Sequence, residues 1–426
     1  MLSSGAWLSL MGVILSFATI IVLIRKRVNF GLALILGSVL IGIFSLLVIS
    51  PVDILKAFIQ AVIYNFDSQT FQLQTIELAV LMTIIYILAV VMQKTGAIER
   101  LIVSLRSFLS NGGTILAIPA IYGLMPVPGG ALFSAPVVQD EGNRFKVSVS
   151  KQNFFNIWFR HIWFPVYPIS STILIMADLS GIGLYALITA NLTAFFIMIT
   201  IGIGIFMFTL RNHIDKNKKT QNNVKHSFSG LRYLIPPILP IFFSQLTIFG
   251  ISLFTAYIIG VLFSIFLLYF MISVEKKTYL DYLKQSLTWK LAVVIIGIMF
   301  FREIFEISGV NAVIFSLLQN GNISPMILII VFPLLLGFLT GYLLSGITLS
   351  YVLLAPFFSS ISLVTIGCVS ILFISGFVGY LISPIHLCNV LSSEYLKTDT
   401  TRMYYVLIPA ALLLLCLHTL FIYFVF

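Results

Sequence analysis

The chain has 426 residues, of which 60% are hydrophobic and 9% are charged, and its mean hydropathy is +1.10. No soluble core needs that much apolar surface, so the composition excludes a soluble domain and predicts an all-α membrane protein whose main partner is the lipid bilayer. A β-barrel is excluded because the apolar runs are continuous rather than alternating. The net charge of +10 is explained by the positive-inside rule, without a nucleic-acid partner.

About ten apolar runs are long enough to cross a bilayer as helices. They cover roughly residues 6–24, 29–49, 73–93, 152–176, 183–210, 233–249, 251–272, 290–308, 362–392 and 403–425. Two further stretches, 114–137 and 326–356, are rich in glycine and proline and are expected to be re-entrant hairpins. Segments 97–110 and 277–289 mix apolar and charged residues at helical spacing, which is typical of amphipathic interfacial helices.

The basic residues give an orientation to this scheme. Of the 24 Lys and Arg residues, all except Lys56, Arg160 and Arg302 fall in segments that the scheme places in the cytoplasm, which leaves 21 on that side. Both termini are then expected outside. The first run is expected to be a membrane helix rather than a cleavable signal, because the basic residues 25–27 follow it and none precedes it.

The two halves of the chain resemble each other. The tripeptide Leu-Ala-Val at 78–80 returns at 291–293, an offset of 213 residues, and Gly96 returns as Gly309 at the same offset. Gly123 matches Gly337 at an offset of 214 and Pro168 matches Pro384 at an offset of 216. We therefore expect inverted repeats at 1–210 and 233–426, joined by a basic cytoplasmic linker at 211–232, as in many secondary transporters.

The first hairpin has its tip in the sequence Pro-Val-Pro-Gly-Gly, which includes Pro128, Gly129 and Gly130. These residues do not suit a continuous lipid-facing helix, and non-helical backbone at membrane depth is tolerated where it lines a cavity or is buried in protein. The tip is therefore a candidate substrate-binding segment. The alternative is a kinked helix packed against its neighbours.

A crossing is interrupted after residue 160. Pro165 and Pro168 break the helix, and a second half-helix is expected to open with three hydroxyl residues, namely Ser170, Ser171 and Thr172. The N-terminus of a half-helix carries free N–H groups and a positive dipole end, so it is a candidate anion site.

Arg160 and His161 lie just before this break. An intramembrane arginine marks a functional site by default and suits bidentate binding of a carboxylate or phosphate. The alternatives are an arginine that snorkels to the interface, or one that pairs with Asp140 or Glu141. His161 is a candidate for proton coupling, and otherwise a hydrogen-bonded packing residue.

In the second half, Arg302 and Glu306 are spaced i,i+4, which predicts an ion pair on one helix face, while Glu303 points elsewhere. The alternative role of Glu303 and Glu306 is a proton relay.

The second hairpin contains Ser345, Gly346 and Thr348, which are candidate tip residues for substrate. The alternative is close helix packing through small residues.

The second interrupted crossing has Pro384 at its break, with Ser383, His386 and Asn389 around it. Their oxygens and the imidazole are candidates to hold sodium or a proton, and otherwise they satisfy the broken backbone. The three cysteines, Cys368, Cys388 and Cys416, have no spacing typical of a metal site. Neither a cofactor nor a resident metal is expected beyond a coupling H⁺ or Na⁺, and no motif of an enzyme is present.

Three segments resemble one known family: residues 124–136, 156–168 and 383–395 are similar to an uncharacterised prokaryotic membrane family, number 401 of the domain-of-unknown-function series. That family is placed in the ion transporter superfamily, with gluconate and lactate permeases and dicarboxylate carriers. The resemblance implies a homodimer in the cell (inner) membrane, with elevator motion of a transport part. It implies a scaffold at about 1–95 and 233–308, and a transport part at about 113–210 and 326–426.

The sequence therefore predicts a secondary active transporter, or permease, of a small organic anion coupled to H⁺ or Na⁺. Arg160 and the half-helix near Ser170 would receive the anion, and the two hairpin tips would close over it. One alternative is a cation/proton antiporter with Glu303, Glu306 and the histidines in the proton path. A more remote alternative is an intramembrane enzyme acting on lipid.

Overall fold

A computed structural model describes residues 4–66, 68–108, 112–124, 130–211, 228–310, 313–314, 316–317, 321, 324–358 and 362–425. The chain forms two compact units. The first comprises Met1–Thr83, Asp178–Ile182 and Thr288–Tyr380, and the second comprises Ile84–Ala177, Gly183–Leu287 and Leu381–Phe426. The division by scaffold and transport part expected from the family resemblance stays a prediction.

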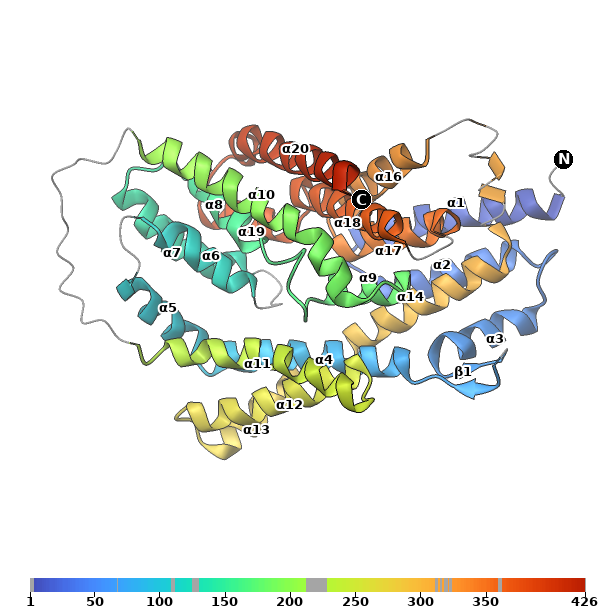
Figure 1. The fold of residues 1–426 in the computed structure, drawn as a ribbon, viewed down its shortest axis with the longest axis horizontal. Helices are drawn as coiled ribbons and strands as arrows, with labels where there is room; N and C mark the ends of the chain where they lie inside the picture. Colours follow the sequence, from blue (N-terminus) through green and yellow to red (C-terminus); the bar gives the residue numbers. More distant parts are fainter. Residues whose placement is uncertain are drawn as a thin grey trace. The chain divides into compact units, whose positions relative to one another are not determined.

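The first half of the chain is almost entirely helical (Figure 1). Its elements are α1 (Ser4–Arg25), α2 (Phe30–Phe44), α3 (Pro51–Val62), β1 (Tyr64–Asn65), β2 (Thr70–Phe71), α4 (Gln74–Lys94), α5 (Ala97–Phe108), α6 (Thr114–Gly123), α7 (Ala131–Arg144), α8 (Val149–Arg160), α9 (Ser171–Ser180) and α10 (Leu184–Leu210). The two short strands pair antiparallel, with Tyr64 opposite Phe71.

The described part of the second half is also helical (Figure 1). Its described elements are a 3₁₀ turn (Leu231–Leu234), α11 (Ile235–Phe243), a 3₁₀ turn (Ser244–Phe249), α12 (Leu253–Met271), α13 (Lys276–Ser286), α14 (Lys290–Ile307), α16 (Pro325–Thr340), α17 (Leu343–Leu354), a 3₁₀ turn (Ala355–Phe357), α18 (Leu363–Ile382), α19 (Leu387–Tyr395) and α20 (Thr400–Val425). Both segments expected as amphipathic interfacial helices are helical, as α5 and α13.

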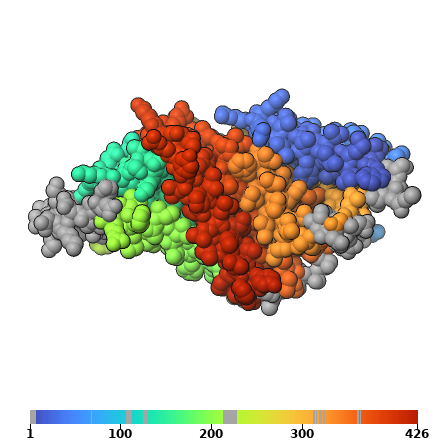
Figure 2. Space-filling view, turned by 90° about the horizontal axis from the view of Figure 1, so that it is seen from above, coloured from blue at the N-terminus to red at the C-terminus, as the bar shows by residue number. Residues whose placement is uncertain are grey.

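Seven helical segments of the described chain are long and apolar enough to cross a membrane. They are Trp7–Arg25, Gln74–Lys94, Leu184–Leu210, Leu231–Phe249, Leu253–Met271, Val364–Tyr395 and Thr400–Val425. The surface of α20, dark red in Figure 2, carries exposed apolar side chains that include Leu412, Leu413, Leu420 and Phe421. The protein is therefore an all-α integral membrane protein in contact with the lipid bilayer.

Both expected helix breaks are present. The apolar run 152–176 forms α8 and α9, separated by residues 161–170, and the run 362–392 forms α18 and the start of α19, separated by residues 383–386. In the first break the Asn191 side chain donates to the freed Pro165 carbonyl at 2.9 Å. The prolines thus interrupt the helices, and neighbouring side chains satisfy the released backbone.

Both glycine- and proline-rich stretches form helical hairpins. In the first, α6 and α7 contact each other, and the tip residues 125–129 between them lie outside the described part of the chain. In the second, α16 turns into α17 at Gly341, whose φ of +60° ends α16 in the left-handed conformation. The helices α6 and α7 have 10 and 14 residues, so they rise about 15 and 21 Å, well short of a hydrocarbon core of about 30 Å.

The glycines matched between the halves have the same backbone role. Gly96 follows α4 with φ +70°, and Gly309 follows α14 with φ +68°. This left-handed conformation ends both helices, and glycine adopts it at little energetic cost.

Candidate functional site

Arg160 is the last residue of α8 and is 3% exposed. Its Nη1 donates to the Tyr122 carbonyl at 3.0 Å, near the end of α6. Its guanidinium lies against Gly130 at the start of α7, so closely that a methyl group at Gly130 would overlap it. The charged group is therefore buried inside the second unit, beside the two residues that flank the tip of the first hairpin, and does not extend to the surface of the protein.

The second hairpin has an equivalent contact without an arginine. A methyl group at Gly123 of α6 would overlap the Arg160 carbonyl, and one at Gly337 of α16 would overlap the Gly376 carbonyl of α18. Gly376 is 216 residues after Arg160, the offset that also separates Pro168 from Pro384. The same helix approach thus occurs in both hairpins, with an arginine in one and a glycine in the other.

A buried polar network lies beside Arg160, formed by α7, α8 and α19. Asn156 donates to the Ala131 carbonyl at 2.9 Å and to the Ser392 hydroxyl at 2.7 Å. The Ser392 hydroxyl donates to Asn153 Oδ1 at 2.6 Å, and Asn153 donates to the Ser393 hydroxyl at 2.8 Å. These hydrogen bonds fix the start of α7 and the middle of α19 against the helix that carries Arg160.

The network was not predicted from the sequence, although α8 gives a signal for it. Asn153, Asn156 and Arg160 are spaced i, i+3 and i+7, so they share one face of the helix. All three are buried, and Ser134 of α7 also bonds to Asn156. A buried polar face on a helix of a membrane protein is an expected signature of a site.

The second break is organised by Asn389 of α19. Its Nδ2 donates to the Leu381 carbonyl at 2.9 Å and to the Ser383 carbonyl at 3.1 Å. The Tyr404 hydroxyl also donates to the Ser383 carbonyl, at 3.1 Å. Asn389 Oδ1 is buried and accepts no hydrogen bond from the described residues. The asparagine thus holds the broken backbone with one end and offers a buried oxygen at the other.

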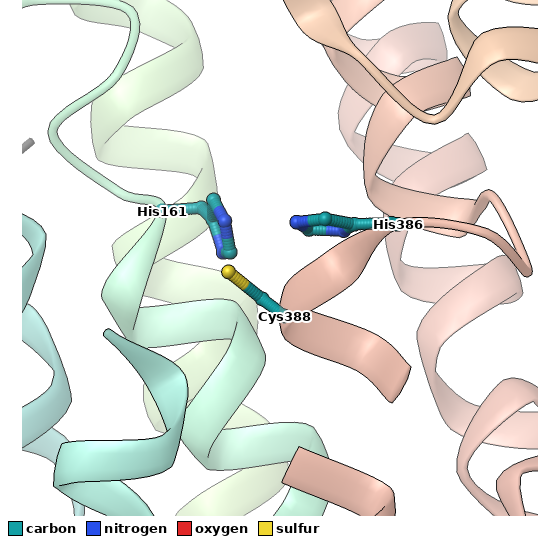
Figure 3. Close-up of side chains that lie close together, drawn as sticks. All are labelled: His161, His386 and Cys388. Carbon is teal, nitrogen blue, oxygen red and sulfur yellow. The ribbon is translucent and has the colours of Figure 1, made fainter. Parts of the chain in front are cut away.

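The two breaks bring His161 and His386 together. Their rings are 4.9 Å apart, and Cys388 lies beside them (Figure 3). All three side chains are buried, and their ligand atoms lie within 4.8 Å of one another. His161 Nδ1 is 2.6 Å from the Ile157 carbonyl. The cluster could hold a metal ion, although the spacing of the cysteines did not predict one.

Ser170, Ser171 and Thr172 open α9 as expected. Ser170 accepts the first helical hydrogen bond, from Leu174 N at 3.1 Å, and its hydroxyl lies 3.0 Å from that of Thr172. The guanidinium of Arg160 lies against Gly130, at the start of α7. Of the expected tip residues, Gly130 thus joins Arg160, while Pro128 and Gly129 lie outside the described residues.

The candidate residues of the second hairpin lie within α17, after the turn. Ser345 donates to Thr340 Oγ1 at 2.7 Å and bonds to the Tyr342 carbonyl, so it holds the turn. Thr348 donates to the Leu344 carbonyl of its own helix. A methyl group at Gly346 would lie 3.0 Å from the backbone of Gly337, so the glycine allows α16 and α17 to approach closely. This geometry agrees with the packing alternative.

A cavity of about 280 Å³ lies in the first unit and is lined by Arg302, Glu306 and Tyr351. Although Arg302 and Glu306 share this cavity, the two described side chains do not form the expected i,i+4 ion pair. Glu303 is half-buried on the same helix, α14, and is not among the cavity-lining residues.

The chain was compared with known proteins. The model of one family, described as protein of unknown function (DUF401), matches residues 8–425. The comparison with curated proteins gives no significant match. Since the family model covers nearly the whole chain, from α1 to the end of α20, this protein belongs to the DUF401 family.

Proposed function

We propose that this protein is a secondary active transporter, or permease, that carries a small organic anion across the membrane with H⁺ or Na⁺. The observation that carries the proposal is the buried guanidinium of Arg160 at Gly130. A guanidinium binds carboxylate and phosphate through two parallel hydrogen bonds. The guanidinium of Arg160 lies at the N-terminus of α7, which has no side-chain cap. The helix dipole therefore adds to the positive potential there.

The second hairpin supports a binding role of Arg160 over a packing role. In the second hairpin, Gly376 holds the position equivalent to Arg160, and the helices approach just as closely. The fold of a hairpin against its broken helix therefore does not need an arginine. A charged side chain at this depth is costly, and substrate binding gives a reason for it.

The architecture supports transport. The hairpin helices are shorter than the bilayer is thick, two helices are broken, and glycines recur at matched positions in the two halves. These features are typical of inverted-repeat transporters, whose site lies near the midplane. We extend the proposal to about ten crossings, both termini outside the prokaryotic cell membrane, a homodimer, an elevator mechanism and membership of the ion transporter superfamily.

Two places in the second unit are suited to the coupling ion. Asn389 Oδ1 and the carbonyls of the second break provide buried oxygens for Na⁺. His161 and His386 provide imidazoles for a proton. The oxygens lie on α19 and in the second break, and the histidines lie one in each break. The charge of Arg160 acts on both histidines, so a proton bound there would act close to the proposed anion site.

The cavity lined by Arg302 and Glu306 favours a second candidate, a cation/proton antiporter. In that case Glu306 would exchange the proton and the cation, and Arg160 would have no part in binding.

A thermal-shift screen tests the anion proposal directly. Organic acids, with and without sodium, are added to the purified protein in detergent, and at least one carboxylate is expected to raise its unfolding temperature. Arg160→Lys keeps the charge but loses the planar guanidinium, so it should weaken binding of that carboxylate at least about tenfold. Arg160→Gln should abolish the rise in unfolding temperature. The control is Arg144→Lys, at the end of α7, where the side chain is 39% exposed and pairs with Glu141. A shift that persists in both Arg160 variants would refute the assignment.

A further inference from the structure

Three side chains with soft or borderline donor atoms meet where the two helix breaks come together. His161 directly follows α8, His386 directly precedes α19, and Cys388 is the second residue of α19. In Figure 3 the His386 ring points toward His161, and the Cys388 sulfur lies next to the His161 ring. The three side chains are 0%, 1% and 7% exposed, so water does not compete freely for their donor atoms.

The geometry of His161 is that of a metal ligand. His161 Nδ1 lies 2.6 Å from the Ile157 carbonyl, which can only accept, so this nitrogen carries the proton and Nε2 keeps its lone pair. Metal-binding histidines almost always donate their second ring N–H to a carbonyl or carboxylate, which fixes the ring and its tautomer.

The distances allow one ion to touch all three donors. With donor atoms no more than 4.8 Å apart, a point exists that is at most about 2.8 Å from each of them. Small side-chain rotations then give the bond lengths of about 2.0–2.3 Å that are usual for metal–nitrogen and metal–sulfur bonds.

The charge of the surroundings selects the ion. Arg160 precedes His161 directly, and its buried guanidinium acts electrostatically on both histidines. A monovalent ion bound to two neutral imidazoles and one thiolate gives a neutral complex. A divalent ion would leave a net charge of about +1 beside the guanidinium in a region of low dielectric, which is costly.

We propose that His161, His386 and Cys388 form a three-coordinate binding site for Cu(I). This ion is soft, prefers thiolate and imidazole donors and is satisfied by three ligands, whereas structural zinc sites almost always have four. Binding releases the thiol proton of Cys388 to solvent and changes no oxidation state. The bound ion links the two helix breaks, and while it is bound His161 and His386 are not available to carry a coupling proton.

The test uses the full-length protein, purified anaerobically in detergent and titrated with Cu(I) against a chromophoric Cu(I) chelator. One ion per chain is expected to bind, and X-ray absorption should report two nitrogen ligands and one sulfur ligand. His161→Gln, His386→Gln and Cys388→Ser should each weaken binding at least about 100-fold, more than the loss of an outer-shell partner usually costs. Cys416→Ser, at an exposed position on α20, and Cys368→Ser should bind like the wild type.

Thermal unfolding of each variant without copper shows whether it still folds. The proposal is overturned if those of the three ligand variants that fold bind Cu(I) as tightly as the wild type. It is also overturned if absorption data show no sulfur ligand, or if Zn²⁺ displaces Cu(I) from the same residues. None of these outcomes bears on the anion site, because Arg160 is unchanged in every variant.

Discussion

Arg160 shows how far a single residue can be interpreted before a structure is available. The sequence marked it as an intramembrane charge, and the structure buries its guanidinium between a hairpin and a broken helix. Its neighbours Asn153 and Asn156 were missed, because the candidates in this crossing were taken from the proline break and the residues next to it, whereas both asparagines lie before the break. Their spacing with Arg160 on one helix face was the available signal.

Gly130→Ala is the sharpest test of where the guanidinium lies. The added methyl group overlaps the guanidinium, so Arg160 must move while its charge stays in the protein. We expect the anion that stabilises the wild type to bind at least about tenfold more weakly, a loss of about 1.4 kcal/mol. Binding is measured by the ligand concentration needed for half of the thermal shift.

The control for this variant is Gly183→Ala, which precedes α10 and has no atom within 4 Å of an added methyl group. It should bind like the wild type. Unchanged binding by a folded Gly130→Ala variant would place the anion elsewhere.

Helices and their breaks were the most predictable elements, because proline and glycine act through their own backbone. The breaks at 161–170 and 383–386 lie where Pro165, Pro168 and Pro384 predicted them. The turn of the second hairpin is an informative difference. The left-handed Gly341 ends α16, whereas Ser345, Gly346 and Thr348 remain helical because each finds its packing or hydrogen-bond partner there.

The matched glycines Gly96 and Gly309 predict equal effects in the two halves. An alanine at either position must adopt a φ near +70°, which costs about 1–2 kcal/mol. Gly96→Ala and Gly309→Ala should therefore lower the unfolding temperature in detergent by similar amounts.

Gly204→Ala is the reference, because Gly204 lies inside α10 with ordinary helical backbone and open space around it. It should leave the unfolding temperature unchanged or raise it. If only one of the two repeat glycines is sensitive, the two helix ends do not have the same role.

At the scale of the whole molecule, composition and charge were enough to predict an all-α membrane protein, and the candidate spans confirm this class. Contacts between distant segments were not predictable. His161 and Cys388 are 227 residues apart, and Asn156 bonds to Ser392 across 236 residues. Nothing local in either segment specifies its partner; the pairing arises only when both breaks fold within the second unit.

The most direct test of the central claim is uptake into proteoliposomes of the anion found by thermal shift, under inward proton or sodium gradients. If Arg160 binds the anion, the wild type and Arg144→Lys should accumulate it. Arg160→Lys and Arg160→Gly should not accumulate the anion. Glycine is the residue found at the equivalent position, 376, in the second half. Dependence on the pH gradient would assign coupling to His161 and His386, and dependence on sodium would assign it to Asn389 and the backbone around it. Accumulation by a folded Arg160→Gly variant at the rate of the wild type would show that Arg160 does not bind the transported anion.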